Sequence, residues 1–85
     1  MKRQMVLRRA EAVVMERQQS YGDPAASMAT VAARWSITLG QPVTPAQVVL
    51  CLIDLKLARL SHNPGHYDSA VDLAGYAALL QEIAS

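Results

Sequence analysis

Two basic residues three positions apart are followed, after a short break, by two acidic residues four positions apart. The basic pair is Lys56 and Arg59, and the acidic pair is Asp68 and Asp72. Helical residues three or four positions apart lie on one face, so each pair would form a charged stripe. The break is short enough to turn the chain back, which would bring the two stripes together. The sequence therefore predicts a polar cluster that is either a structural ion network or the floor of a binding site.

Anion binding is the chemistry that this cluster suits. Arg59 can hold a phosphate or carboxylate through its planar guanidinium group, and Lys56 can do so as a point charge. The two acids would then orient these cations or bind a ribose hydroxyl. Tyr76 extends the acidic stripe. Its neighbour Gly75 marks a place where a neighbouring helix or a ligand can come close.

The same residues support two other interpretations. In the first, an Arg59–Asp72 ion pair is purely structural, because buried charges are normally paired. In the second, Asp68 and Asp72 supply half of a Mg²⁺ site. The further acids that such a site needs are missing nearby, and Lys56 and Arg59 would compete for the carboxylates. We therefore assign neither a metal nor a cofactor to the chain.

A second polar motif follows the first segment with helical periodicity. Arg17 and Tyr21 share a helix face one turn apart, and Gly22 lets the backbone approach another group closely. Asp23 and Pro24 are the residue types that favour a helix cap and the first helical position. The motif predicts at least a helix stop, and Arg17 and Tyr21 can also close a binding site.

The remaining reactive side chains do not form a catalytic set. His62 and His66 flank a Pro-Gly turn, where exposed loop histidines are expected. Cys51 is the only cysteine and lies in the apolar run 48–53, so we expect a buried thiol that behaves as a small hydrophobe. The chain has no glycine-rich phosphate loop and no nucleophile beside a base. An enzyme is therefore not favoured, and no catalytic residue is assigned.

Periodicity and helix caps predict one α-helical domain over residues 1–85. Apolar residues recur at helical spacing in three segments, 2–20, 24–39 and 45–60, and a fourth helix capped by Asp68 or Ser69 runs to about residue 84. No segment alternates with the period of two that a strand requires. The third helix is apolar on nearly all sides, which is typical of a central, buried element. We therefore predict an all-α, compact bundle of about four helices.

Composition limits the kinds of partner. The formal net charge is only +1, which argues against a nucleic-acid partner, and the longest apolar run is far too short to span a membrane. Residues 1–20 carry five cations and two acids. This basic start opposes the helix dipole, so the first helix is free to fray or to project into an oligomer.

The apolar content is high for so short a chain. Hydrophobic residues make up 52% of it, although a chain of this length buries only roughly 60% of its unfolded surface. Some apolar surface is therefore left for a partner, and we expect a homo-oligomer. The single cysteine and the lack of an apolar signal segment favour a cytoplasmic location.

Several motifs, taken in order, resemble one family. They are Arg17…Tyr21-Gly22-Asp23-Pro24, Trp35-Ser36, Leu55-Lys56-Leu57-Ala58-Arg59 and Asp68…Asp72-Leu73-Ala74-Gly75-Tyr76. Over about residues 10–80 the chain resembles a small domain of unknown function that is common in bacteriophages and prophages. That family often has Asn and then an aromatic residue where this chain has Ser27 and Met28. The resemblance implies an all-α phage protein and brings no established activity.

A looser likeness is to all-α nucleotide pyrophosphohydrolases of the MazG type, in which helix acids hold Mg²⁺ against a triphosphate. Those enzymes carry Glu-x-x-Glu followed by Glu-x-x-Asp. The place of the first motif is taken here by Lys56-x-x-Arg59, with the opposite charge. The likeness, together with this exchange, favours direct anion binding over hydrolysis.

These observations lead to one hypothesis and two alternatives. We expect an oligomeric phage protein that binds an anionic, nucleotide-like molecule and thereby sequesters a host nucleotide signal of antiviral defence. The expected ligand-binding residues are Lys56, Arg59, Asp68, Asp72, Tyr76, Arg17 and Tyr21. The alternatives are a Mg²⁺-dependent nucleotide hydrolase and a module that docks its basic first helix on a host protein.

Overall fold

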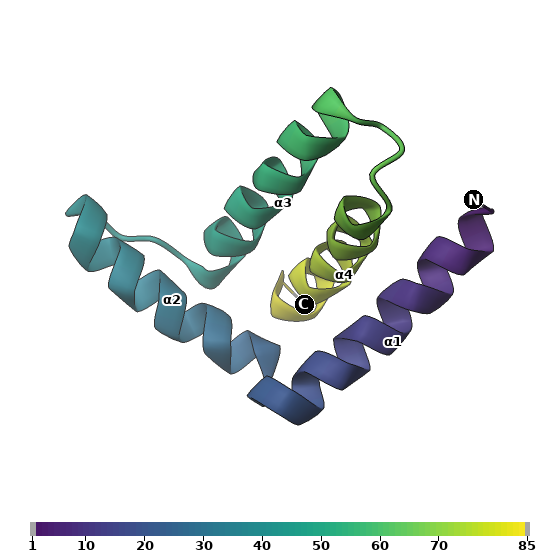
Figure 1. The fold of residues 1–85 in the computed structure, drawn as a ribbon. Helices are drawn as coiled ribbons and strands as arrows, with labels where there is room; N and C mark the ends of the chain where they lie inside the picture. Colours follow the sequence, from purple (N-terminus) through teal and green to yellow (C-terminus); the bar gives the residue numbers. More distant parts are fainter. Residues whose placement is uncertain (1, 85) are drawn as a thin grey trace.

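Four α-helices contain most of residues 2–84, which are the residues described by the computed structural model (Figure 1). They are α1 (Arg3–Tyr21), α2 (Pro24–Leu39), α3 (Pro45–His62) and α4 (Tyr67–Ala84). No strand is present within this part of the chain. The prediction of an all-α bundle of four helices is confirmed. None of these helices combines the length and the apolar character that a membrane span needs.

Three of the expected helix boundaries follow from local contacts. Gly22 and Gly40 have positive φ angles of 81° and 70° and stand directly after α1 and α2. Asp23 caps α2 by accepting a hydrogen bond from a backbone N–H at 3.2 Å. Thr44 and Gln47 form a reciprocal capping box at the start of α3, with hydrogen bonds of 3.2 and 2.9 Å. These boundaries depend on residues within one turn of each other, which is why the sequence predicts them.

The start of α4 differs from the expectation. His66 precedes the helix, and its Nδ1 accepts a hydrogen bond from the backbone N–H of Ser69 at 3.3 Å. The Ser69 hydroxyl lies 2.7 Å from the same nitrogen, and Ser69 is fully buried. The prediction that Asp68 or Ser69 caps this helix was therefore wrong. An imidazole nitrogen takes the place of the usual carboxylate or hydroxyl oxygen, and the helix begins at Tyr67.

The helix α4 is the centre of the arrangement. It packs along α3 on one side and along α1 on another, and it contacts α2 over a shorter stretch, while α2 also packs on α3. Figure 1 shows α1 and α2 diverging from the turn between them, with α4 lying inside the angle. Residues far apart in the sequence therefore meet on the faces of α4.

The helix α3 lies at the edge of the molecule and is buried on one side only. Its buried residues are Val48, Val49 and Lys56, whereas Leu50 and Leu57 are each 47% exposed. The prediction of a central, buried third helix was wrong, because an all-round apolar composition does not tell a core helix from one with an uncovered face. Cys51 is likewise exposed, contrary to expectation.

Candidate functional site

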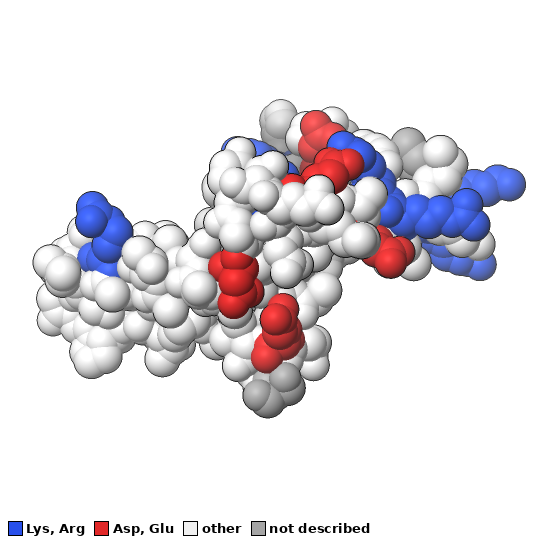
Figure 2. All heavy atoms as spheres, turned by 90° about the horizontal axis from the view of Figure 1, so that it is seen from below, with Lys and Arg blue, Asp and Glu red and all other residues white. Residues whose placement is uncertain are grey.

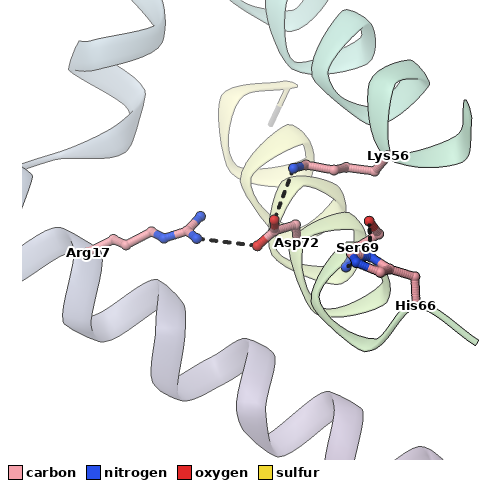
Figure 3. A network of polar contacts seen from close by, with 5 residues as sticks. All are labelled: Arg17, Lys56, His66, Ser69 and Asp72. Carbon is pink, nitrogen blue, oxygen red and sulfur yellow. Dashed lines mark hydrogen bonds and ion pairs between the residues drawn. The ribbon is translucent and has the colours of Figure 1, made fainter. Parts of the chain in front are cut away.

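Asp72 links three helices through its two carboxylate oxygens. Its Oδ2 lies 3.1 Å from Nζ of Lys56 on α3, and its Oδ1 accepts a hydrogen bond of 3.3 Å from Nη2 of Arg17 on α1. Figure 3 shows the two cations reaching Asp72 from different helices. This carboxylate therefore connects α4 to both α1 and α3.

The two cations differ in their access to solvent. The side chain of Lys56 is 11% exposed and that of Asp72 is 16% exposed, so this pair lies largely within the protein. The side chain of Arg17 is 54% exposed. A buried ion pair is costly to break, whereas a half-exposed pair contributes little to stability. The ion pair with Asp72 therefore holds the Lys56 ammonium group in place, while the Arg17 guanidinium group can also bind a solute.

The structure does not bring Arg59 or Asp68 into this network. Arg59 is exposed on α3, and within residues 2–84 it makes no ion pair. The Arg59–Asp72 bridge considered above is not formed. Asp72 pairs with Lys56 and Arg17 instead, and Arg59 is exposed to solvent. Lys56 is seven residues after Val49, so both side chains point to the buried side of α3.

An apolar cavity of about 280 Å³ lies between α1, the start of α2 and α4. Apolar side chains such as Val14, Met28 and Leu79 line most of it. Four of the residues expected at a site also line it, and these are Arg17, Tyr21, Asp72 and Tyr76. Lys56 and Arg59 do not line it.

A polar pocket of about 350 Å³ adjoins the apolar cavity. Arg9, Tyr67 and Asp68 contribute to its lining, together with Arg17 and Asp72. Because Arg17 and Asp72 line both spaces, their ion pair lies at the junction between an apolar compartment and a polar one.

Positive charge gathers beside the polar pocket. Figure 2 shows Lys and Arg side chains concentrated at the end of the molecule that carries the start of α1. Lys2, Arg3, Arg8 and Arg9 are all exposed there. Arg9 pairs with Glu16 at 3.5 Å, but both side chains are more than half exposed. Clustered exposed cations attract anions over a distance and raise their rate of encounter.

The structure shows which group comes close to Gly75. A Cβ atom at this residue would lie 3.4 Å from Cγ2 of Val14 on α1. The group that comes close is therefore a neighbouring helix. Gly75 also lines the apolar cavity, so the missing side chain leaves space there.

The acids of this region are not arranged as a metal site. Within the part of the chain that the structure describes, no three His, Cys, Asp or Glu side chains gather closely enough to hold a metal ion. Asp72, one half of the Mg²⁺ pair considered above, is already bound by two cations.

Sequence reasoning did not find several residues of these spaces. Arg9 and Tyr67 line the polar pocket, and Met28 and Leu79 line the apolar cavity. A signal for Arg9 was available, because Arg9, Val13 and Arg17 recur at four-residue intervals on α1. The others depend on how the helices dock, and no pattern along the chain indicates them.

The fold and the cluster at Asp72 define an all-α domain whose central helix is tied by ion pairs to two others. Residues 5–84 match the family described as Domain of unknown function (DUF6378). The chain belongs to this family.

Two phage proteins are similar to the chain. It is 36% identical over 80 residues to the Gene 55 protein of Mycobacterium phage L5. The aligned residues are 92% of the chain and 51% of that phage protein. The chain is 32% identical over 68 residues to the Gene 55 protein of Mycobacterium phage D29, covering 80% of the chain and 45% of that protein. The chain therefore spans about half the length of the curated relatives that it matches. No solved structure gives a significant match.

These comparisons confirm the expectation of a small phage domain of unknown function. The individual motifs and the likeness to MazG-type enzymes are not tested by them and stay predictions.

Proposed function

We propose that the protein binds a small anionic molecule with an aromatic part, of which a nucleotide is the fitting class. The observation that carries this proposal is the junction of an apolar cavity with a polar pocket at Arg17. The aromatic part would enter the cavity, and the anionic part would lie over Arg17 in the pocket.

The size and lining of the apolar cavity support a base-sized group. Its volume of about 280 Å³ is at the small end of ligand sites, so a single ring system fits better than an entire nucleotide. Tyr21 is 80% exposed and Tyr76 is partly buried, and both line the cavity. Stacking on a ring would cover the exposed face of Tyr21, a favourable change for an aromatic side chain.

Arg17 has the properties of the anion-binding group. Only its Nη2 is engaged with Asp72, so the other N–H groups of its guanidinium can donate to a phosphate. Arg9 lines the same pocket and is held only by a weak surface pair. Asp68 lines the pocket too and can accept a hydrogen bond from a ribose hydroxyl.

In this proposal Lys56 and Asp72 position Arg17 rather than touch the ligand. Lys56 is buried against Asp72, and Asp72 in turn orients the guanidinium. Arg59 has no part in the site, which differs from the role expected for it. The biological role that we propose is sequestration of a host nucleotide signal, which a phage protein achieves by binding alone.

Calorimetric titration with nucleotides tests this proposal. The panel contains mononucleotides, dinucleotides and cyclic oligonucleotides of each base. We expect one class to bind and Arg17→Ala to weaken its binding about ten- to a hundredfold, because a hydrogen bond to a charged group is lost. The matched control is Arg59→Ala, which removes an exposed arginine of α3 and leaves the affinity unchanged.

Other outcomes would contradict the proposal in distinct ways. If Arg59→Ala weakened nucleotide binding as much as Arg17→Ala, the binding site would lie at the basic pair Lys56 and Arg59 on α3. Absence of binding by the whole panel would refute the nucleotide class. Release of phosphate or pyrophosphate in the presence of Mg²⁺ would identify a hydrolase instead.

A further inference from the structure

Gly75 is a glycine inside a helix that no backbone conformation requires. It lies in the interior of α4, which runs from Tyr67 to Ala84, and its backbone is helical. The glycines with positive φ angles are Gly22 and Gly40, which follow α1 and α2. Apart from proline, glycine is the least favourable residue in a helix interior, and alanine is the most favourable. The glycine at this position therefore lowers the stability of α4 and needs another explanation.

Packing against α1 does not require a glycine either. A Cβ atom at Gly75 would lie 3.4 Å from Cγ2 of Val14, which is an ordinary van der Waals contact. No second atom of another helix within residues 2–84 comes within 4 Å of this position. Val14 is 36% exposed and lines the apolar cavity, so its side chain has space to move. Alanine would therefore fit between α1 and α4.

The absent side chain instead leaves space in the apolar cavity. Asp72, Gly75 and Leu79 lie on one face of α4, because they are three and four positions apart, and all three line the cavity. Gly75 stands one turn of helix after Asp72, or about 4.5 Å along the axis. Asp72 in turn pairs with Arg17, the proposed anion-binding group. A ring against Gly75 and a phosphate over Arg17 are therefore within the span of a single nucleotide.

A flat ring is the group that gains most from this space. A glycine lets another group lie against the helix backbone, whereas a methyl group at the same place would hold the plane of a ring away from it. Tyr21 and Tyr76 line the cavity as well and give the ring aromatic neighbours. The free energy gained by burial grows with the apolar area that is covered. In the same cavity, the two rings of a purine therefore gain more than the single ring of a pyrimidine.

We propose that Gly75 is a specificity-determining residue, which admits a purine base against the backbone of α4. This inference rests on the nucleotide site proposed above and names the class of base that enters the cavity. The base lies over Gly75, and the phosphate lies over Arg17, one helical turn away. The space left for the ligand then explains why α4 carries so unfavourable a residue.

Gly75→Ala separates a role in binding from a role in packing. In the full chain this substitution should raise Tm by a few degrees, because alanine favours the helix and its side chain fits beside Val14. In calorimetric titration the unchanged chain should bind the purine members of the nucleotide panel more tightly than the pyrimidine members. Gly75→Ala should weaken purine binding about tenfold or more and remove this preference, since the added methyl group overfills the occupied cavity.

Ala77→Gly is the matched control. Ala77 is exposed on α4 and lines neither of the two cavities described above. This substitution should lower Tm, because it puts a glycine into the same helix, and it should leave the affinity for nucleotides unchanged. The two variants therefore change stability and affinity in different combinations.

Three outcomes would overturn this inference alone. A fall in Tm caused by Gly75→Ala would show that α1 needs a glycine for its packing on α4. An unchanged affinity of this variant for purine nucleotides, or equal binding of purines and pyrimidines by the unchanged chain, would show that Gly75 does not select the base. In each case binding that depends on Arg17 would leave the proposed function in place. Absence of binding by the whole panel would refute both.

Discussion

At the scale of single residues, one carboxylate, that of Asp72, makes ion pairs that join both α1 and α3 to α4. Each oxygen of Asp72 faces a different cation, and the two cations come from two different helices, α1 and α3. The buried partner, Lys56, is 8% exposed and has no other ion pair within the described residues. A buried charge is tolerated only where an opposite charge compensates it. Lys56 has Asp72 as its counter-charge, whereas Asp72 has both Lys56 and Arg17, so the loss of Asp72 harms Lys56 more than the loss of Lys56 harms Asp72.

This inequality leads to a prediction for two substitutions. Asp72→Asn should lower the free energy of unfolding by about 3 kcal/mol, because it leaves Lys56 buried without a counter-charge. Lys56→Met should cost less than about 1.5 kcal/mol, because the apolar stem is kept and Asp72 still has Arg17. Urea unfolding of the two variants measures the difference.

The double variant Lys56→Met/Asp72→Leu is the control for this comparison. It should be more stable than Asp72→Asn alone, because no uncompensated charge remains. Equal losses in the two single variants would show that the ion pair is not the reason for the effect.

At the scale of the helices, a histidine defines where α4 begins. His66 Nδ1 accepts the backbone N–H of Ser69, and this hydrogen bond satisfies a donor in the first turn that would otherwise lack a partner. The backbone oxygen of His66 accepts from the N–H of Ala70 at 3.2 Å, as expected of a residue at the cap position. The position of α4 matters for function, because the first turns of this helix carry Asp68 and Asp72.

Substitution of His66 tests the cap. His66→Ala should lower the free energy of unfolding by about 1 kcal/mol, which corresponds to a fall of about 4–8 °C in Tm for a domain of this size. His66→Asn should restore most of this loss, because its side-chain oxygen is a good capping acceptor. His62→Ala is the control, since His62 is exposed and should change Tm by less than about 2 °C. A His66→Asn variant as unstable as His66→Ala would exclude the capping role.

At the scale of the whole molecule, the four helices leave an uncovered side. The centre of the fold is α4, and the outward side of α3 has no neighbour within residues 2–84. Among residues 2–84 the largest side chains that are fully buried are those of Val48, Val49 and Ser69, and none of them is a large apolar group. A domain with so small a core gains stability from association with a partner.

Association predicts a thermal stability that depends on concentration. If the chain forms the homo-oligomer that its apolar content predicts, Tm should rise by several degrees when the protein concentration is raised a hundredfold, because mass action favours the oligomer over unfolded monomers. Scanning calorimetry at two concentrations measures this effect, and a Tm independent of concentration would contradict the expectation.

The sequence by itself determined the features that arise within one turn of helix. Gly22, Asp23 and the Thr44–Gln47 pair mark helix boundaries through contacts between residues at most a few positions apart, and the structure has these boundaries. The order of motifs also indicated the phage family, which the comparisons confirmed. The cap by His66 is local too, but residue preferences for capping pointed to Asp68 and Ser69 instead.

Only the tertiary structure decided which cation meets Asp72 and which face of α3 is covered. Lys56 and Arg59 lie three positions apart and are equivalent in the sequence, yet Lys56 points to α4 and Arg59 to solvent. Arg17 joins the same carboxylate from a helix 55 positions away. Such contacts depend on the rotation and the offset with which helices dock. Many side chains set these together, and no spacing along one helix specifies them.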